Sequence, residues 1–178
     1  MVNSPLKVPE VTFEQAIAFT QSLLSQVEAD QLKEPELATI VSELVKTENG
    51  ARGFFVTYLT SESSIADNPP TAVVQALQTS PEVALLVKNL AMSAAQAVYH
   101  RRNHKEDMAQ DSERVHQRTA RLIELVDLPA VYDRLQQLQQ TITTGEGSYK
   151  AFLERWGYDT EQKQIISQAL QQVISHQK

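Results

Sequence analysis

Histidine and glutamate side chains close together in the sequence are the best candidates for metal binding. His100 and His104 are four residues apart, so a helix would place both imidazoles on one face. Glu113 precedes His116 by three residues, the spacing at which helical bundles bind a pair of iron ions. Such a site needs two of these pairs and two further carboxylates, whereas the chain offers one pair. Two arginines between His100 and His104 would also repel a cation, and we predict no metal site.

Arginine residues at helical spacing could bind phosphate or an acidic partner. Arg114, Arg118 and Arg121 follow one another at intervals that gather their side chains on one helix face. The alternative is pairing within the helix, where Asp111 lies three residues before Arg114. Glu124 likewise lies three residues after Arg121. No aromatic residue lies among the arginines for base stacking and no helix-turn-helix pattern surrounds them, so nucleic acid binding is not expected.

A narrow polar seam on an otherwise apolar helix could serve a small ligand. With about 100° between successive residues, four polar side chains share one edge of this helix. If that edge faced an internal cavity, the protein would bind a small molecule or metal and could be an enzyme. Lys88 lies apart from the seam among apolar neighbours; a buried lysine can act in covalent catalysis, but more often such a lysine extends to water. The seam consists of Asn89, Ser93, Gln96 and His100.

No signature of a catalytic or cofactor-binding motif is present in the sequence. Residues 50–53 read Gly-Ala-Arg-Gly, which lacks the glycine spacing and the preceding strand of a phosphate-binding loop. The chain also lacks a nucleophile elbow, a zinc-protease motif and a dinucleotide fingerprint. We therefore predict no catalytic residue and no cofactor, and favour a protein that is not an enzyme.

The composition indicates a folded protein from a reducing compartment. A chain of 178 residues can bury about 70% of the surface that it exposes when unfolded. The absence of cysteine excludes disulfides and thiolate chemistry and fits a cytoplasmic protein. No N-terminal leader pattern is present, and residues 83–98 are too short and too polar to cross a membrane. We expect a soluble cytoplasmic protein without a membrane partner.

Charge is unevenly distributed along the chain. The net charge of -6 argues against nonspecific nucleic acid binding by the whole molecule. Residues 99–121, however, hold six basic and four acidic side chains. Because this stretch carries +2, the rest of the chain carries -8. The stretch is therefore the best candidate for a surface that meets a partner.

The segment from residue 80 to residue 126 should organise the fold. Ser80 and Pro81 are typical of a helix start, and apolar side chains then recur on nearly all sides, which predicts a central helix over residues 81–102. One helix continuing to residue 126 would be about 69 Å long, more than a domain of this size spans. We favour two helices joined by a turn near residues 103–111; one long bent helix is the alternative.

Further helices are expected on both sides of this segment. Residues 53–60 contain β-branched and aromatic side chains typical of a strand, but their apolar spacing is helical and no partner strand is available. We therefore predict a helix there. Two of the other helices should begin with a capping pair, Thr12 with Gln15 and Asp159 with Gln162. One should run from Pro35 to a stop at Gly50 and another from Ser148 to a stop at Gly157. The remaining starts are expected at Asp67, at Asp111 or Ser112, and at Asp127 with Pro129.

Taken together, these patterns predict an all-α fold. We expect one compact multi-helix domain of about eight helices over residues 11–178, packed around a central buried helix at residues 81–102. Residues 1–10, with two prolines, should form an irregular N-terminal arm.

Two stretches of the sequence resemble uncharacterised proteins encoded in cyanobacterial genomes. They are residues 50–60, GARGFFVTYLT, and residues 86–92, LVKNLAM, with the following His100-Arg101-Arg102-Asn103. The resemblance implies membership of an uncharacterised all-helical family and a bacterial cytoplasmic origin. It implies no activity and no functional residue.

From the sequence we predict an interaction or regulatory module rather than an enzyme. A protein partner or self-association is expected, and a small ligand or metal at the polar seam is the alternative. The predicted partner surface lies around the turn after the central helix. Its candidate residues are Arg101, Arg102, His104, Lys105, Arg114 and Arg118.

Overall fold

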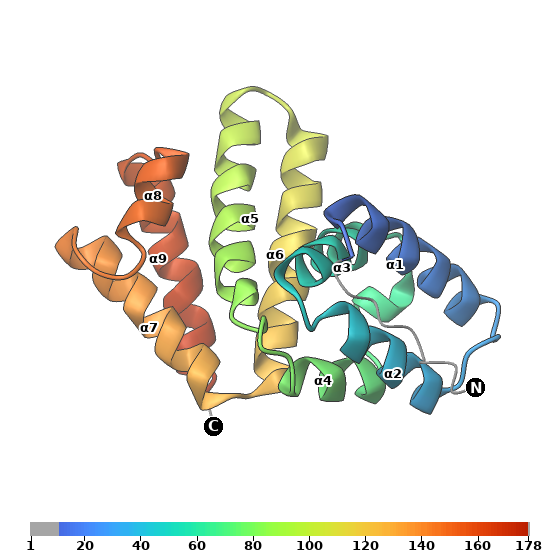
Figure 1. The fold of residues 1–178 in the computed structure, drawn as a ribbon. Coiled ribbons are helices and arrows are strands. Elements are labelled where there is room, and N and C mark those ends of the chain that lie inside the picture. Colours follow the sequence, from blue (N-terminus) through green and yellow to red (C-terminus); the bar gives the residue numbers. More distant parts are fainter. Residues whose placement is uncertain (1–10, 178) are drawn as a thin grey trace. The chain divides into compact units, whose positions relative to one another are not determined.

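The computed structural model describes residues 11–177, and the irregular arm expected at residues 1–10 lies outside them. The described residues form nine α-helices and one short 3-10 helix and contain no strand, which confirms the all-α fold class (Figure 1). None of these helices combines the length and the apolar character needed to span a membrane. The elements are α1 (Phe13–Glu28), α2 (Glu34–Leu44), α3 (Glu48–Thr60), the 3-10 helix η1 (Ser64–Ala66), α4 (Thr71–Gln78), α5 (Leu85–Arg102), α6 (Glu106–Val126), α7 (Pro129–Thr144), α8 (Lys150–Trp156) and α9 (Thr160–Ser175).

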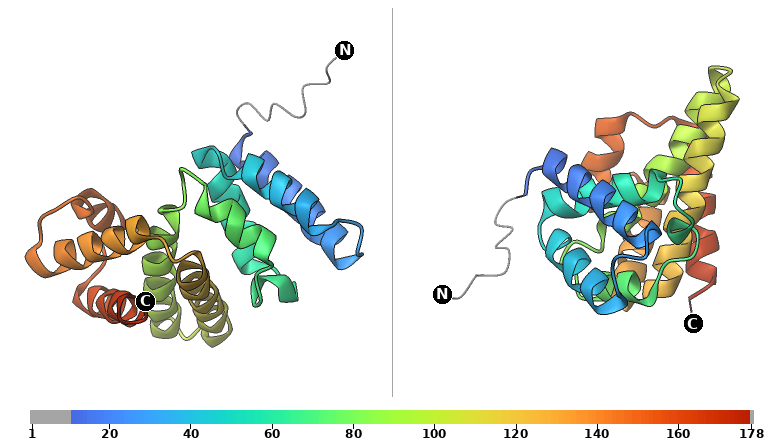
Figure 2. Two further views of the ribbon diagram at one scale, coloured as in Figure 1. Left: turned by 90° about the horizontal axis from the view of Figure 1, so that it is seen from below. Right: turned by 90° about the vertical axis from the view of Figure 1, so that its right-hand side faces the viewer.

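The helices pack into two compact units, one ending at residue 83 and the other beginning at residue 84 (Figure 1, Figure 2). In the first unit α1 packs on α3 and α2 packs on α4. In the second unit α5 packs on both α6 and α9, and α7 packs on α9. Each unit buries large side chains, such as Phe54 and Tyr58 in the first and Leu90 and Leu122 in the second. The single domain expected over residues 11–178 stays a prediction.

The start of α1 has the expected capping box. The Thr12 hydroxyl accepts a hydrogen bond from the Gln15 backbone N–H at 3.1 Å, and the Gln15 side chain accepts one from the Thr12 N–H at 3.0 Å. These bonds satisfy two backbone donors that a helix N-terminus otherwise leaves unpaired. Asp159 and Gln162 form the same reciprocal pair at the start of α9, which confirms the second predicted capping box.

Residues 53–60 are helical, as the spacing of their apolar side chains predicts. They belong to α3, where Phe54, Phe55 and Tyr58 are all buried. The rings of Phe54 and Tyr58 stack with their centroids 5.2 Å apart, one helical turn from each other. The Tyr58 hydroxyl donates a hydrogen bond to the Ile65 carbonyl, so the polar end of this buried ring is satisfied. The strand alternative is excluded for this segment.

The expected stop of the second helix at Gly50 is wrong. Helix α2 ends at Leu44, and α3 has already begun at Glu48, with the Thr47 hydroxyl accepting from the Gly50 N–H at 3.2 Å. A Cβ atom on Gly50 would lie 2.0 Å from the Leu44 carbonyl oxygen. Glycine is therefore needed here for a close backbone approach between two helices, a non-local requirement that the sequence pattern does not distinguish from a stop signal.

Helices α1 and α3 approach each other closely at Gly53. A Cβ atom on Gly53 would lie 2.4 Å from the Ala16 Cβ and 2.8 Å from the Phe13 carbonyl oxygen. Ala16 itself is fully buried. Small residues at both positions let the two backbones pack closely, so the first unit depends on a glycine in the middle of a helix.

Helix α5 is the central helix of the second unit, but it begins later than predicted. The α-helix starts at Leu85, and residues 81–84 form a turn. The Ser80 hydroxyl accepts from the Glu82 N–H at 3.1 Å and donates to the Val45 carbonyl at 2.6 Å. A hydroxyl that binds the N–H two residues on makes a tight turn instead of capping a long helix, which is why the expected start fails.

The chain turns between α5 and α6, which confirms two helices rather than one bent helix. His104 has a left-handed φ of 57°, and its N–H donates to the Arg101 carbonyl at 3.1 Å. The Lys105 N–H donates to the His100 carbonyl at 2.9 Å, which completes a Schellman motif with histidine in the place of the usual glycine. Helix α6 then begins at Glu106, so the predicted caps at Asp111 and Ser112 are wrong: three residues suffice for the turn.

Glycine follows the ends of both α7 and α8, and the stop predicted at Gly157 is confirmed. Gly145 and Gly157 follow the two helices with φ values of 78° and 61°, a region where residues with a Cβ are disfavoured. Ser148, however, does not cap α8. Its hydroxyl donates to the Gln137 side chain at 3.1 Å instead.

We predict that Gly53→Ala lowers the free energy of unfolding by about 1–3 kcal/mol, because the new methyl group has no space against Ala16. Helix propensity alone predicts the opposite, a gain of about 0.5–1 kcal/mol. Urea unfolding of the wild type and the variant measures the sign. In a double-mutant cycle, Ala16→Gly should recover part of the loss when it is combined with Gly53→Ala; strictly additive effects would contradict the close approach.

We predict that His104→Gly raises the free energy of unfolding by about 0.5–1 kcal/mol, because glycine adopts a left-handed φ without steric cost. His104→Ala is the matched control, since alanine removes the imidazole but keeps the Cβ atom. Only the glycine variant should have a higher urea midpoint. An equal rise of the urea midpoint in both variants would show that the imidazole, and not the backbone conformation, destabilises the wild-type protein.

Candidate functional site

Arg101 joins the end of α5 to two turns of α6. Its guanidinium lies 3.3 Å from a Glu106 carboxylate oxygen through Nε and 2.8 Å from a Glu113 oxygen through Nη1. Hydrogen bonding to Arg101 lowers the pKa of Glu113 from its ordinary value. Glu113 therefore stays ionised and engaged with Arg101, so it is not free to act with His116 as a metal-binding pair.

Arg102 makes the corresponding connection from α5 to the start of α9. It forms a bidentate ion pair with the two Asp159 carboxylate oxygens, with N–O distances of 2.5 and 3.1 Å. A Glu161 carboxylate oxygen lies 3.1 Å from the same guanidinium. The hydrogen bonds from Arg102, and next the Gln162 N–H, lower the pKa of Asp159 to about 2. A basic residue at a helix C-terminus and acidic residues at a helix N-terminus also complement the two helix dipoles.

These ion pairs flank a surface that we call the hairpin end. It comprises the turn between α5 and α6, with the ion pairs of Arg101 and Arg102 on either side of it. His104 and Lys105 are exposed in the turn itself. The structure thus brings four of the six candidate partner residues together at one place.

The other two candidate residues do not join this exposed surface. Arg114 is half-buried and forms an ion pair with Asp111 at 3.3 Å, the intrahelical alternative expected from the sequence. Arg118 is only 4% exposed, although its spacing from Arg114 and Arg121 suggests one solvent-facing stripe. Arg118 is adjacent to Thr119 on the buried part of α6, so a partner cannot reach it on the surface.

Large apolar side chains are exposed around the hairpin end. Tyr99 is 52% exposed one turn before the end of α5, and Met108 is 46% exposed in the first turn of α6. Trp156, also 46% exposed, ends α8 three residues before Asp159, the partner of Arg102. Tyrosine, tryptophan, methionine and arginine are the residue types enriched in protein interfaces.

The four residues of the polar seam, predicted as an alternative site, differ in burial. The Ser93 hydroxyl is buried and donates to the Asn89 and Leu90 carbonyls of its own helix, at 2.8 and 3.1 Å. Gln96 is exposed, and His100 packs edge-on against the Tyr99 ring with the centroids 5.5 Å apart. Neither of the two pockets described for this protein is lined by a seam residue.

Lys88 and the histidines also adopt structural roles. Lys88 is exposed, with its ammonium 5.6 Å from the centre of the Phe152 ring, as expected for a lysine that extends to water. Burial lowers the pKa of His116, although a hydrogen bond to the Leu90 backbone and the charge of Glu113 act in the opposite direction. Among the described residues, no three His, Cys, Asp or Glu side chains are placed to hold a metal ion.

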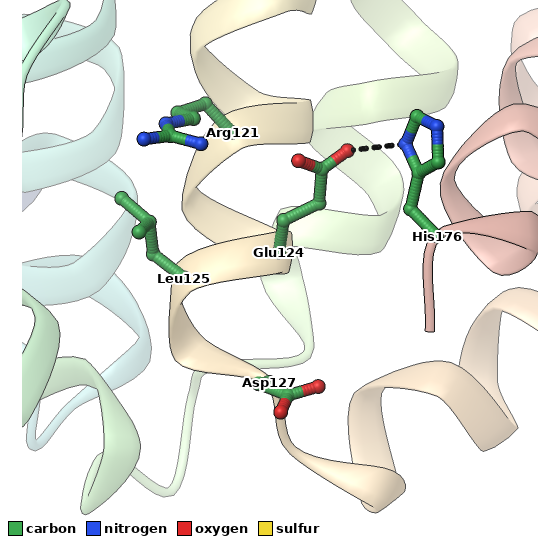
Figure 3. Close-up of a pocket in the computed structure, with 5 residues that line it drawn as sticks. All are labelled: Arg121, Glu124, Leu125, Asp127 and His176. Carbon is green, nitrogen blue, oxygen red and sulfur yellow. Dashed lines mark hydrogen bonds and ion pairs between the residues drawn. The ribbon is translucent and has the colours of Figure 1, made fainter. Parts of the chain in front are cut away.

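A separate cleft lies at the other end of α6; of its lining residues the sequence points only to Arg121, as a member of the arginine series. It has a volume of about 400 Å³ and lies where α6 and α9 both end (Figure 3). His176 Nδ1 and a Glu124 carboxylate oxygen are 2.9 Å apart there. The two residues are 52 positions apart in the chain, so local spacing gives no signal for this pair. The cleft is lined by Arg121, Glu124, Leu125, Asp127 and His176.

Comparison with known protein families places this chain in one of them. The sequence pattern described as "Uncharacterised conserved protein UCP020893" matches residues 12–173. The chain belongs to this family. The matched region includes the whole hairpin end and all of the cleft except His176. No curated protein and no solved structure matches the chain.

We predict that the two arginines act on different carboxylates. Arg102→Gln should raise the pKa of Asp159 from about 2 toward 3.8, and Gln162 should keep it somewhat below that value. The pKa of Glu113 should not change. Arg101→Gln should do the reverse, raising the pKa of Glu113 and leaving Asp159 unchanged. Carbon-13 NMR of the carboxyl groups during a pH titration measures both values in each variant.

We also predict that Arg102→Gln differs from the wild type in its stability at acid pH. Because the folded-state pKa of Asp159 is depressed, its ion pair stabilises the protein above about pH 3.8 and is lost as the pH falls toward 2. Between about pH 3.8 and pH 2, the free energy of unfolding should therefore fall less in Arg102→Gln than in the wild type. An equal loss in both proteins would show that Arg102 does not bind Asp159 in solution.

Proposed function

We propose that this protein is a non-catalytic interaction module that binds a protein partner through the hairpin end. The observation that carries the proposal is the exposure of Tyr99 and Met108 beside two arginine ion-pair networks. An interface needs apolar anchors that lose contact with water, surrounded by polar groups that fix the orientation. The hairpin end and the helix turns next to it offer both kinds of group.

Rigidity of this surface favours binding. Arg101 holds α5 to α6, and Arg102 holds α5 to α9, so the backbone that carries Tyr99 is fixed from two directions. The Schellman motif at His104 fixes the turn as well. A surface ordered before binding loses less conformational entropy when a partner binds. The ion pairs therefore support recognition mainly by holding geometry.

The nature of the partner follows from how charge is arranged there. Each of the two arginines already contacts two carboxylates, so the hairpin end is not a patch of free positive charge. A phosphate-rich partner would have to compete with these carboxylates for the two guanidinium groups. A protein surface with an apolar pocket for Tyr99 and polar groups around it is a better match than a nucleic acid.

Self-association through the same surface is one form of this proposal, with a second copy of the chain as the partner. The cytoplasmic location and the cyanobacterial origin expected from the sequence also belong to the proposal. They are supported by the absence of cysteine and by the resemblance of residues 50–60 and 86–92.

Site-specific photo-crosslinking in cells that naturally produce the protein tests the proposal. A benzophenone amino acid replaces Tyr99 in one variant and Trp156 in a second. Phe19, which is 49% exposed on α1 in the first unit, is the matched control because it is an equally exposed aromatic residue. We expect a protein adduct of one defined mass at Tyr99, a weaker one at Trp156 and none at Phe19.

The mass and peptide composition of the adduct identify the partner, and an adduct of twice the chain mass identifies a second copy. Met108→Ala should weaken the Tyr99 adduct, since it removes a neighbouring apolar anchor without touching the ion pairs. The proposal is wrong if Tyr99 gives no adduct or if Phe19 gives the same adduct with equal yield.

A further inference from the structure

The cleft at the ends of α6 and α9 has a negative side formed by two carboxylates. Burial raises the pKa of the Tyr132 hydroxyl, and the charges of Asp127 and Glu124 raise it further, so both carboxylates act on one small region. Helix α6 ends at Val126 and α9 ends at Ser175, and helix C-termini add negative partial charge. Among the ion pairs of the described residues, none involves Asp127.

The cleft also has a positive side at Arg121. The expected pairing of Arg121 with Glu124 does not form, because Glu124 instead bonds His176 (Figure 3). In that view the Arg121 guanidinium points away from the His176 contact. Arg121 is exposed, and no ion pair within the described part of the chain includes it. A guanidinium without an ion-pair partner can bind the carboxylate of a ligand.

The two sides are separated along one helix and joined by an apolar residue. Arg121 precedes Asp127 by six residues, a rise of about 9 Å along α6. Leu125 lies between them on the lining of the cleft. The volume of about 400 Å³ is within the range of small-molecule sites, roughly 300–1,000 Å³. The cleft therefore offers one guanidinium, one apolar side chain and two carboxylates, of which Asp127 lies farther along the chain from Arg121 than Glu124 does (Figure 3).

We propose that this cleft binds a small zwitterion whose ammonium and carboxylate groups are joined by an aliphatic chain. Arg121 binds the carboxylate, Leu125 contacts the methylene groups, and Asp127 with Glu124 binds the ammonium. His176 holds the Glu124 carboxylate in position through Nδ1. This site is independent of the hairpin end, which lies at the opposite end of α6.

Three compounds of equal chain length test the proposal on the full-length protein. They are 6-aminohexanoate, which carries both charges, 1,6-diaminohexane, which carries two positive charges, and hexanedioate, which carries two negative charges. Calorimetric titration at low ionic strength measures each affinity. We expect 6-aminohexanoate to bind at least about tenfold more tightly than either of the others, because only it matches both sides.

Two variants test whether 6-aminohexanoate binds in the cleft. Arg121→Gln removes the positive side, and Asp127→Asn removes one negative group while keeping a residue that tolerates the left-handed φ of 49° at this position. Each should weaken binding of 6-aminohexanoate by about tenfold or more. Arg155→Gln, at an exposed arginine of α8 outside the cleft, is the matched control and should leave the affinity unchanged.

Three results would overturn the proposal. The first is no saturable binding of 6-aminohexanoate. The second is equal or tighter binding of 1,6-diaminohexane or hexanedioate, which would show recognition of one charge only. The third is binding that survives both Arg121→Gln and Asp127→Asn, which would place the site elsewhere. None of these results bears on the crosslinking of Tyr99, so the two proposals fail separately.

Discussion

Two consecutive arginines at the C-terminus of α5 connect this helix to two of its neighbours in the second unit. Successive side chains on a helix differ by about 100° in direction, so Arg101 and Arg102 leave α5 toward different neighbours. Arg101 contacts the acids of α6, and Arg102 contacts the acids that begin α9. Both arginines also lie where the helix dipole favours positive charge. This single dipeptide therefore fixes the end of α5 against the two helices that pack on it.

The ion pairs matter for geometry more than for overall stability. All of the side chains involved are substantially exposed, and exposed ion pairs contribute about 0–1 kcal/mol each. The free energy of folding comes instead from buried residues such as Leu90 and Leu122. What the ion pairs provide is a fixed position for the surface around Tyr99. Because carboxylates pair with both arginines, the recognition proposed for this surface relies on the exposed apolar side chains.

Local sequence signals predicted the fold well and the site only in part. Helical spacing identified residues 53–60 correctly against their strand-like composition, and two capping boxes and the glycine stop at Gly157 are where the sequence places them. Three of the errors have one cause, namely a contact that the local pattern does not show. Gly50 is needed because Leu44 is close, Ser80 is turned toward Val45, and Glu124 binds His176 rather than Arg121. A window of a few residues contains none of these partners, so spacing alone assigns each residue to its commonest local role.

The three arginines of α6 show why spacing does not determine function. Arg114, Arg118 and Arg121 share one helix face in the sequence pattern, yet the first pairs with Asp111, the second is buried and the third is exposed beside a cleft. The difference at Arg121 arises because His176 occupies its nearest acid, Glu124, and leaves the guanidinium without an intrahelical partner. A charged group that has lost its local partner is more available to a ligand than one that keeps it. The distribution of partners therefore distinguishes the paired and buried arginines of this helix from Arg121, the exposed one on which the proposed ligand site depends.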